Sequence, residues 1–216
     1  MNKFTTYSIL ALFIISIVAC KEIANETQDI NKTDAIETSS EPSATTTHFL
    51  EYNGVKIYLP SRYELYSYVK YQSLIDSLLT KQEYKMESYR LNQLTEMDGK
   101  LYLFYDQDKK ASVSIKATPH IAFTREDAQE LLNSISYDNQ NLPDRNKLEI
   151  EKVSAKFNGT VNQQVFKTVY KFSEKKTKNT WYQTNYTMSS NKKTILLEFT
   201  EAQLNDYDSY ILKTIF

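Results

Sequence analysis

The sequence predicts an α+β fold in which helices cover the faces of a central, mostly antiparallel sheet, with an opening β-hairpin and a C-terminal helix. Four segments rich in β-branched and aromatic residues follow one another in the C-terminal third, separated by short polar breaks. Such spacing is typical of neighbouring antiparallel strands. One of these segments carries Val165 and Val169 on one face and Phe166 and Tyr170 on the other. A sheet that is apolar on both faces is expected to be covered on both sides, at least in part.

The opening hairpin is predicted from two short strand-like segments, His48–Tyr52 and Val55–Leu59, on either side of Asn53 and Gly54. We expect a type I′ turn at this pair, because asparagine and glycine accept the positive φ angles that the turn requires. Pro60 ends the second strand, since proline has no N–H to donate to a sheet.

Two helices are predicted next. Ser67 is a suitable N-cap for the first. Thr80 is followed three residues later by Glu83, which is the pattern of a capping box at the start of the second, and Asp98-Gly99 then interrupts the chain. The apolar residues at helical spacing are Val69, Leu74, Ile75, Leu78 and Leu79 in the first helix and Tyr84, Leu91 and Leu94 in the second.

The remaining elements are mainly strands. Leu101–Tyr105 and Ser112–Thr118 are expected to pair across a polar turn, and a short helix begins near Thr124. The four C-terminal strands are predicted at Leu148–Phe157, Gln164–Phe172, Thr180–Met188 and Thr194–Thr200, and the closing helix carries Leu204, Tyr207, Ile211 and Ile215.

The N-terminal segment resembles the signal peptide of a bacterial lipoprotein. Lys3 precedes a mainly apolar run that is shorter than the roughly 20 residues of a membrane-spanning helix, and the run ends in Ile17-Val18-Ala19-Cys20. This ending resembles a lipobox, in which the cysteine is acylated and becomes the first residue of the mature protein. We therefore predict a signal peptide at 1–19, lipidation of Cys20, a disordered polar tether over 20–47, and a single globular domain at 48–216.

The predicted domain resembles the Mog1/PsbP-like α/β/α sandwich. The resemblance rests on the hairpin sequence Gly54-Val55-Lys56-Ile57-Tyr58-Leu59-Pro60, on the strand pair within Thr180–Thr200 and on a terminal helix over Tyr207–Phe216. Proteins of this fold do not share one chemistry, so the resemblance implies a fold and not an activity.

Few sequence features point to catalysis, metals or cofactors, and we predict none of the three. The chain has 26 Lys and Arg against 27 Asp and Glu, a balance that does not indicate a nucleic-acid partner. His48 at a strand start and His120 after Pro119 are read as surface or edge residues and not as metal ligands. Asp106-Gln107-Asp108 is read as a hairpin turn because the glycine and the final acid of a calcium loop are missing. A serine elbow and a glycine-rich phosphate loop are also absent from the sequence.

Aromatic residues form the candidate binding surface. Trp181, Tyr182 and Tyr186 lie on one predicted strand, with Tyr170 on the strand before it. Rigid amphipathic rings of this kind favour contacts with glycans, peptides or proteins. The alternative is that these rings pack the sheet beneath the helices while their polar tips reach water.

The sequence therefore predicts a non-catalytic binding or accessory module, held at the membrane by acyl chains on Cys20 and contacting an envelope protein or a glycan. Lys21-Glu22 after the cysteine differs from the aspartate that retains lipoproteins in the inner membrane, so we expect the outer membrane, in either its periplasmic or its surface leaflet. The alternative function is a lipid-anchored hydrolase whose acids and tyrosines converge only in the folded chain. A pocket with two or more ionisable groups of shifted pKa would favour the hydrolase.

Overall fold

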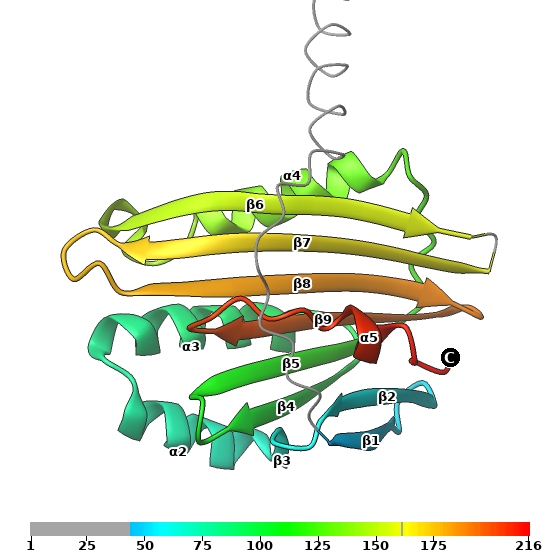
Figure 1. Ribbon diagram of the computed structural model, residues 1–216, viewed down its shortest axis with the longest axis horizontal. Helices are drawn as coiled ribbons and strands as arrows, with labels where there is room; N and C mark the ends of the chain where they lie inside the picture. The colour runs from blue at the N-terminus through cyan, green and yellow to red at the C-terminus, as the bar shows by residue number, and fades with distance from the viewer. Residues whose placement is uncertain (1–43, 161) are drawn as a thin grey trace, which may run out of the picture. The chain divides into compact units, whose positions relative to one another are not determined.

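The structure is a computed structural model that describes residues 44–160 and 162–216, all of which lie in one compact unit (Figure 1). The predicted signal peptide, Cys20 and the tether up to residue 43 lie outside the described residues. The elements are β1 (Thr45–Leu50), β2 (Val55–Pro60), β3 (Glu64–Tyr66), α2 (Tyr68–Leu78), α3 (Lys81–Glu96), β4 (Lys100–Asp106), β5 (Ala111–Thr118), α4 (Ala128–Gln140), η1 (Arg145–Lys147), β6 (Leu148–Gly159), β7 (Gln163–Glu174), β8 (Thr180–Ser190), β9 (Lys193–Glu201) and α5 (Asp208–Ile211).

Seven strands form the central sheet, in the order β3-β4-β5-β9-β8-β7-β6, and each neighbouring pair is antiparallel. After β5 the chain passes through α4 to the far edge of the sheet. It then returns through β6, β7 and β8, so that β9 pairs with β5 in the middle. The predicted α+β fold with an antiparallel sheet, an opening hairpin and a C-terminal helix is confirmed.

Both faces of the sheet are covered, as the two apolar faces of its strands predict. Helices α2, α3 and α4 lie on one face, which we call the helix side (Figure 1). The β1–β2 hairpin and α5 pack on the other face, the hairpin side. Adjacent residues of one strand therefore enter different layers, because successive side chains of a strand point to opposite faces: Phe104 packs under the hairpin and Leu103 under α2 and α3.

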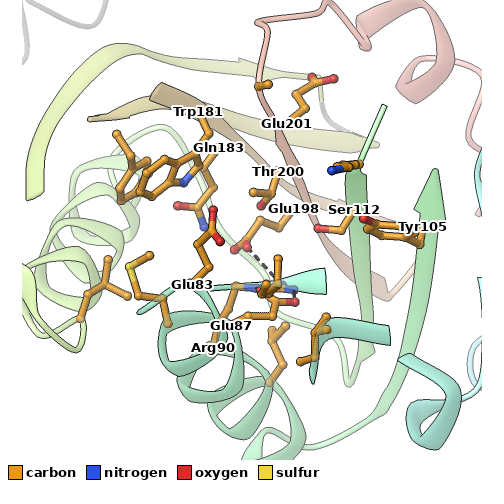
Figure 2. A pocket seen from close by; sticks show the side chains of 18 of the residues that line it. Glu83, Glu87, Arg90, Tyr105, Ser112, Trp181, Gln183, Glu198, Thr200 and Glu201 are labelled. Atoms are coloured by element: carbon orange, nitrogen blue, oxygen red, sulfur yellow. Dashed lines mark hydrogen bonds and ion pairs between the residues drawn. The ribbon is translucent and has the colours of Figure 1, made fainter. Parts of the chain in front are cut away.

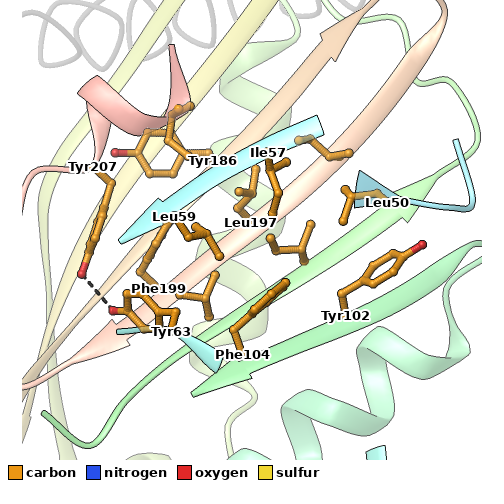
Figure 3. Packing of buried hydrophobic residues seen from close by; sticks show 14 of the residues in the cluster. Leu50, Ile57, Leu59, Tyr63, Tyr102, Phe104, Tyr186, Leu197, Phe199 and Tyr207 are labelled. Carbon is orange, nitrogen blue, oxygen red and sulfur yellow. Dashed lines mark hydrogen bonds between the residues drawn. The ribbon is translucent and has the colours of Figure 1, made fainter. Parts of the chain in front are cut away.

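The core on the hairpin side joins segments that are distant in the sequence. Leu50, Ile57 and Leu59 of the hairpin pack against Phe104 of β4 and Phe199 of β9 (Figure 3). Tyr207, at the start of α5, closes this core, and its ring stacks on Phe199 with the ring centres 3.9 Å apart. The hairpin is therefore held to the sheet mainly by burial of apolar side chains.

The predicted starts of α2 and α3 are confirmed, whereas the helix predicted to begin near Thr124 begins at Ala128. Ser67 caps α2, where its Oγ accepts a hydrogen bond from the backbone N–H of Lys70. Thr80 caps α3 in a complete capping box, since its Oγ1 accepts from the N–H of Glu83 while the Glu83 carboxylate accepts from the N–H of Thr80. Each cap supplies partners for N–H groups that the first turn of a helix leaves free.

The predicted type I′ turn of the opening hairpin is wrong. Leu50 pairs with Val55, so the connection is a four-residue loop, and the N–H of Gly54 donates to the carbonyl of Leu50 at 2.8 Å. Gly54 has a φ of 71°, but Asn53 is not among the non-glycine residues with positive φ. The Asn53 side chain instead bonds to the carbonyl of Thr194, a tertiary contact that local turn chemistry does not reveal.

The predicted C-terminal helix is present but much shorter than Tyr207–Phe216. α5 ends at Ile211, and Ile215 exchanges two backbone hydrogen bonds with Lys56, of 2.8 and 2.9 Å. The free edge of β2 offers unpaired backbone groups, and pairing with them replaces the last turns of the helix. Tyr207 and Ile211 are buried as predicted, whereas half of the Ile215 surface is exposed.

Two further differences concern an additional strand and the start of the hairpin. β3 is a three-residue edge strand that the sequence analysis did not predict. β1 begins at Thr45, three residues before the predicted start of the domain at 48, because the threonines there pair with β2 as far as Pro60. Within the described ranges, no helix combines the length and the apolar character that spanning a bilayer requires.

Candidate functional site

A groove of about 870 Å³ lies on the helix side of the sheet (Figure 2). Residues of α2, α3 and α4 form its walls together with the strand ends near Trp181, and the helix-facing residues of β5, β8 and β9 form its floor. We call it the helix-side groove. Its apolar wall residues include Leu74, Leu78, Met86, Leu94, Ile135 and Trp181, and its polar floor residues include Ser112, Gln183, Asn185, Glu198 and Thr200.

One stripe of α3 forms much of a wall. Glu83, Glu87, Arg90 and Leu94 all line the groove, as does Met97 just after the helix. Their spacing of three or four residues brings them to one side of a helix. The capping box at Thr80 and Glu83 sets where α3 begins. The first half of this stripe is charged and the second half is apolar.

The floor is polar because of strand alternation at the centre of the sheet. Glu198 of β9 pairs with Ser114 of β5 on one side and with Asn185 of β8 on the other. Thr200 is likewise flanked by Gln183 and by Ser112. Directly paired residues share a face, so polar side chains line up across three central strands, where an ordinary core would carry apolar ones.

Arg90 ties the helix wall to this floor. Its Nε donates to Glu87 Oε2 at 2.8 Å, and its Nη2 makes a second, short bond to the other oxygen of the same carboxylate. Its Nη1 donates to Ser114 Oγ at 2.6 Å and lies 3.1 Å from Glu198 Oε1. Tyr71 of α2 donates to Glu87 Oε1 at 2.8 Å. One guanidinium therefore stands between two carboxylates, all three being 13 to 16% exposed.

The two carboxylates of this cluster differ in acidity. Burial raises the pKa of Glu198 above its usual value, the charge of Glu87 adds to this shift, and Arg90 opposes it. Burial also acts to raise the pKa of Glu87, but the attraction of Arg90 and the hydrogen bonds from Arg90 and Tyr71 lower it overall. Glu87 is therefore the stronger acid of the two, and Glu198 takes up a proton more readily.

The four aromatic residues of the predicted binding surface do not share one face. Trp181 and Tyr170 lie on the helix side, where Trp181 lines the groove and stacks on Phe172 with ring centres 5.3 Å apart. Tyr182 and Tyr186 lie on the hairpin side, as their pairing with β9 shows. Strand alternation separates them.

These aromatic residues have different surroundings. Tyr170 is buried and its hydroxyl group bonds to Ser136 of α4 at 2.9 Å. Tyr186 is buried and donates to Asp208 of α5 at 2.8 Å. Of the four residues, Trp181 is the one that borders the groove, and its role in binding stays a prediction.

The histidines and the acidic turn occupy structural positions. The His48 ring packs edge-on against Phe104 with centres 4.7 Å apart, and His120 Nδ1 lies 3.2 Å from Ser189 Oγ, which is fully buried. Asp106 accepts from two backbone N–H groups of the β4–β5 turn and pairs with Arg62 at 2.8 Å. In the described part of the chain, no three His, Cys, Asp or Glu side chains converge in a way that could hold a metal ion.

Sequence reasoning did not find Glu87, Arg90 and Glu198 as a cluster. The available signal was the alternation in β9, in which the polar Glu198 and Thr200 lie opposite the apolar Leu197 and Phe199. That signal shows one polar position beneath a helix layer. The residues that meet it from α3, more than 100 positions earlier, depend on how the helices pack on the sheet.

The arrangement of strands and helices is similar to that of a solved protein. The solution structure of cyanobacterial PsbP (CyanoP) from Synechocystis sp. PCC 6803 superposes with a TM-score of 0.50 over 84% of this chain and 97% of that chain, at 10% sequence identity. The chain has a PsbP-like fold. At this identity the similarity concerns the fold and not the groove, so the predicted resemblance is confirmed for the architecture. No family model and no curated protein matches the sequence.

Proposed function

We propose that the protein is an envelope lipoprotein, anchored in the outer membrane by acyl chains on Cys20, whose PsbP-like domain is a non-catalytic binding module. We further propose that the helix-side groove is its ligand site. The anchor is supported by the lipobox-like ending at Cys20, the single cysteine of the chain. The binding role is supported by the groove itself, a concave site with apolar walls and a few polar groups gathered at its floor.

The composition of the floor favours a binding role over a purely structural one. Charged groups next to a core carry a desolvation cost, and replacing them with packed apolar residues is often neutral or stabilising. Arg90 and Glu87 of α3 nevertheless meet Glu198 over the middle of the sheet. The polar groups at the floor of an otherwise apolar groove would then orient a ligand.

The two carboxylates in the groove favour a second candidate function, a lipid-anchored hydrolase. A pair of acids whose pKa values shift in opposite directions is the usual basis for general acid and base roles, and Glu198 and Glu87 show opposite shifts. Glu87, however, is fully engaged by Arg90 and Tyr71. Hydrolysis of chromogenic esters or glycosides that is lost in Glu198→Gln would establish the enzyme in place of the binding module.

Site-specific photo-cross-linking in the native envelope tests the binding role. In the test variant a photoreactive phenylalanine analogue replaces Trp181 in the groove. In the control the same analogue replaces Tyr68, an exposed aromatic residue of α2 that does not line the groove. We expect a discrete adduct from position 181 and none of the same mass from position 68.

Mass spectrometry of the adduct identifies the ligand. The same products from both positions, or no product at position 181, would contradict the groove as the ligand site. Fractionation of the unlabelled protein in the same cells measures the membrane anchor separately, so the two halves of the proposal succeed or fail independently.

A further inference from the structure

Each of the three guanidinium nitrogens of Arg90 already contacts an oxygen of the protein. Its Nε and Nη2 are bound to the Glu87 carboxylate, and its Nη1 donates to Ser114 while lying beside Glu198. Among the described residues that line the groove, Arg90 is the one arginine, and the two lining lysines, Lys109 and Lys110, belong to the turn between β4 and β5 and not to the floor strands. A carboxylate or phosphate head group would have to displace the carboxylates that already neutralise this guanidinium, so the floor is poorly suited to anions.

The hydrogen-bonding capacity that remains belongs to the neighbouring pair Glu198 and Asn185. Glu198 Oε1 forms an ion pair with Arg90 Nη1 at 3.1 Å, and a carboxylate oxygen can accept more than one hydrogen bond. Asn185 Nδ2 is buried and has no hydrogen-bond partner within the described residues. The two residues face each other across β8 and β9. Glu198 is an acceptor with capacity for a further donor, and Asn185 is a donor without a partner. A buried donor left in this state costs free energy.

A hydroxyl group is the chemical group that complements this pair. It donates one hydrogen bond and accepts others, whereas an ammonium group only donates and a carboxylate only accepts. Thr200, Gln183 and Ser112 lie in the adjacent row of the floor and offer further sites of both kinds. A small rotation of the Asn185 amide toward the groove would let one hydroxyl group bridge it to the Glu198 carboxyl group.

The walls add an apolar requirement. Leu94, Met97 and Ile135 line the groove together with the indole of Trp181. At about 870 Å³ the groove has the size of a small-molecule site. Burial of an alkyl chain against these walls would contribute in proportion to the apolar area covered.

We propose that the helix-side groove binds an uncharged amphiphile that seats a hydroxyl-bearing head, a sugar or a glycerol, on Glu198 and Asn185 and lays its alkyl chain along Leu94 and Trp181. This inference rests on the proposed binding function and specifies its ligand class. Sugar and glycerol heads share the hydroxyl chemistry, and the probes below distinguish them.

Fluorescence of Trp181, the single tryptophan of the chain, reports occupancy of the groove. Four probes with the same chain length are titrated: octyl glucoside, monooctanoylglycerol, octylamine and octanoate, each below its micelle concentration. We expect both hydroxyl-bearing probes to shift the emission and to bind at least fivefold more tightly than octylamine and octanoate. The tighter of the first two shows which head the site prefers.

The Asn185→Leu variant tests the pair directly. It removes an unpaired donor, so the thermal midpoint should stay the same or rise, which separates loss of binding from loss of folding. Affinity for the preferred probe should fall roughly five- to tenfold, the size expected for one or two lost hydrogen bonds. Asn158→Leu on β6, exposed and outside the groove, is the matched control and should bind as the unaltered protein does.

The outcomes separate the inference from the proposed function. Equal binding of all four probes, or tighter binding of octylamine or octanoate, would refute the hydroxyl head while leaving a binding groove. Unchanged affinity in Asn185→Leu would refute the proposed contact. If no probe shifts the Trp181 emission, both the ligand class and the groove as an amphiphile site are wrong, whereas a cross-link at position 181 would still support a binding site for another ligand.

Discussion

The hydroxyl groups of Tyr63 and Tyr207 lie 2.9 Å apart, although 144 residues separate them in the chain (Figure 3). Tyr207 also donates to Glu201 at 2.8 Å and accepts from Arg62 at 3.2 Å. Burial raises the pKa of Tyr63 to about 12, and Glu201 adds to the shift, so both tyrosines stay protonated at neutral pH. This network joins the segment after the hairpin, the end of β9 and the C-terminal segment.

Removal of the Tyr207 hydroxyl group should weaken the fold. Tyr207→Phe keeps the ring that stacks on Phe199 but leaves the buried Glu201 carboxyl group with one fewer partner. We expect a loss of about 2 kcal/mol in the free energy of unfolding, measured by urea denaturation. Tyr137→Phe, at a residue that is 67% exposed, is the control and should change stability little. Equal stability of the two variants would show that the network contributes nothing.

Loss of Arg90 should destabilise the protein more strongly. Arg90→Met leaves Glu87 and Glu198 facing each other without a counterion, and breaking such a buried cluster costs about 3 kcal/mol. The triple variant Arg90→Met, Glu87→Gln and Glu198→Gln removes all three charges and should recover most of that loss. If the triple variant is as unstable as the single one, shape and not charge compensation explains the effect.

The stability should depend on pH through His48. Burial lowers the pKa of His48 from its ordinary value of 6.5 in the folded protein. As the pH falls below about 6.5, His48 therefore takes up a proton in the unfolded chain before it does so in the folded protein. The free energy of unfolding decreases between that pH and the lower pKa of the folded state. His48→Phe, which keeps the ring against Phe104, should remove this loss.

The pH profile is measured as the difference between the two proteins, because other groups titrate in the opposite sense. Burial raises the pKa of Glu198 and Glu201 above the usual glutamate value, so the folded state binds their protons first, which stabilises it as the pH falls toward 4.5. Both proteins contain these acids, and their effect cancels in the difference. A flat difference between pH 5 and 8 would mean that His48 makes no contribution.

The hairpin loop should tolerate asparagine but not valine at position 54. Gly54 has a φ of 71°, in the left-handed region, and an added Cβ would meet nothing closer than Lys193 Nζ at 3.6 Å. The penalty for Gly54→Val is therefore one of backbone strain, about 1–2 kcal/mol, while Gly54→Asn should cost much less. Thermal unfolding compares the two variants, and equal midpoints would show that the loop adapts without a positive φ.

The anchor is tested at Cys20. Cys20→Ser removes the thiol that would be acylated, so we expect the protein to accumulate as an uncleaved or mislocalised precursor without fatty acids. Membrane fractionation and intact-mass measurement of the native protein check this result. A normal distribution of Cys20→Ser between fractions would contradict the lipoprotein proposal.

Much of the fold could be predicted from local patterns. The caps at Ser67 and Thr80 specify where two helices begin, because side chains near in sequence satisfy the free N–H groups there. The four C-terminal strands also appear where alternation and short polar turns predict them. Each of these features depends on residues a few positions apart, so a single sequence contains the necessary information.

The features that were predicted wrongly, or not at all, depend on distant partners. Residues after Ile211 leave the helix because Ile215 meets the open edge of β2 through Lys56. Trp181 and Tyr182 are separated onto two faces by alternation, so the aromatic residues do not combine into one surface. Arg90 meets Glu198 only because α3 lies over the centre of the sheet.

By itself the sequence determined the class of the fold and most of its helices and strands. Export and lipidation at Cys20 stay predictions from the sequence. The tertiary structure alone decided where the groove lies and which charged residues form its floor. The physical reason is distance along the chain: caps, turns and alternation act over a few residues, whereas the groove is formed by residues of α2, α3, α4, β8 and β9 that packing brings together.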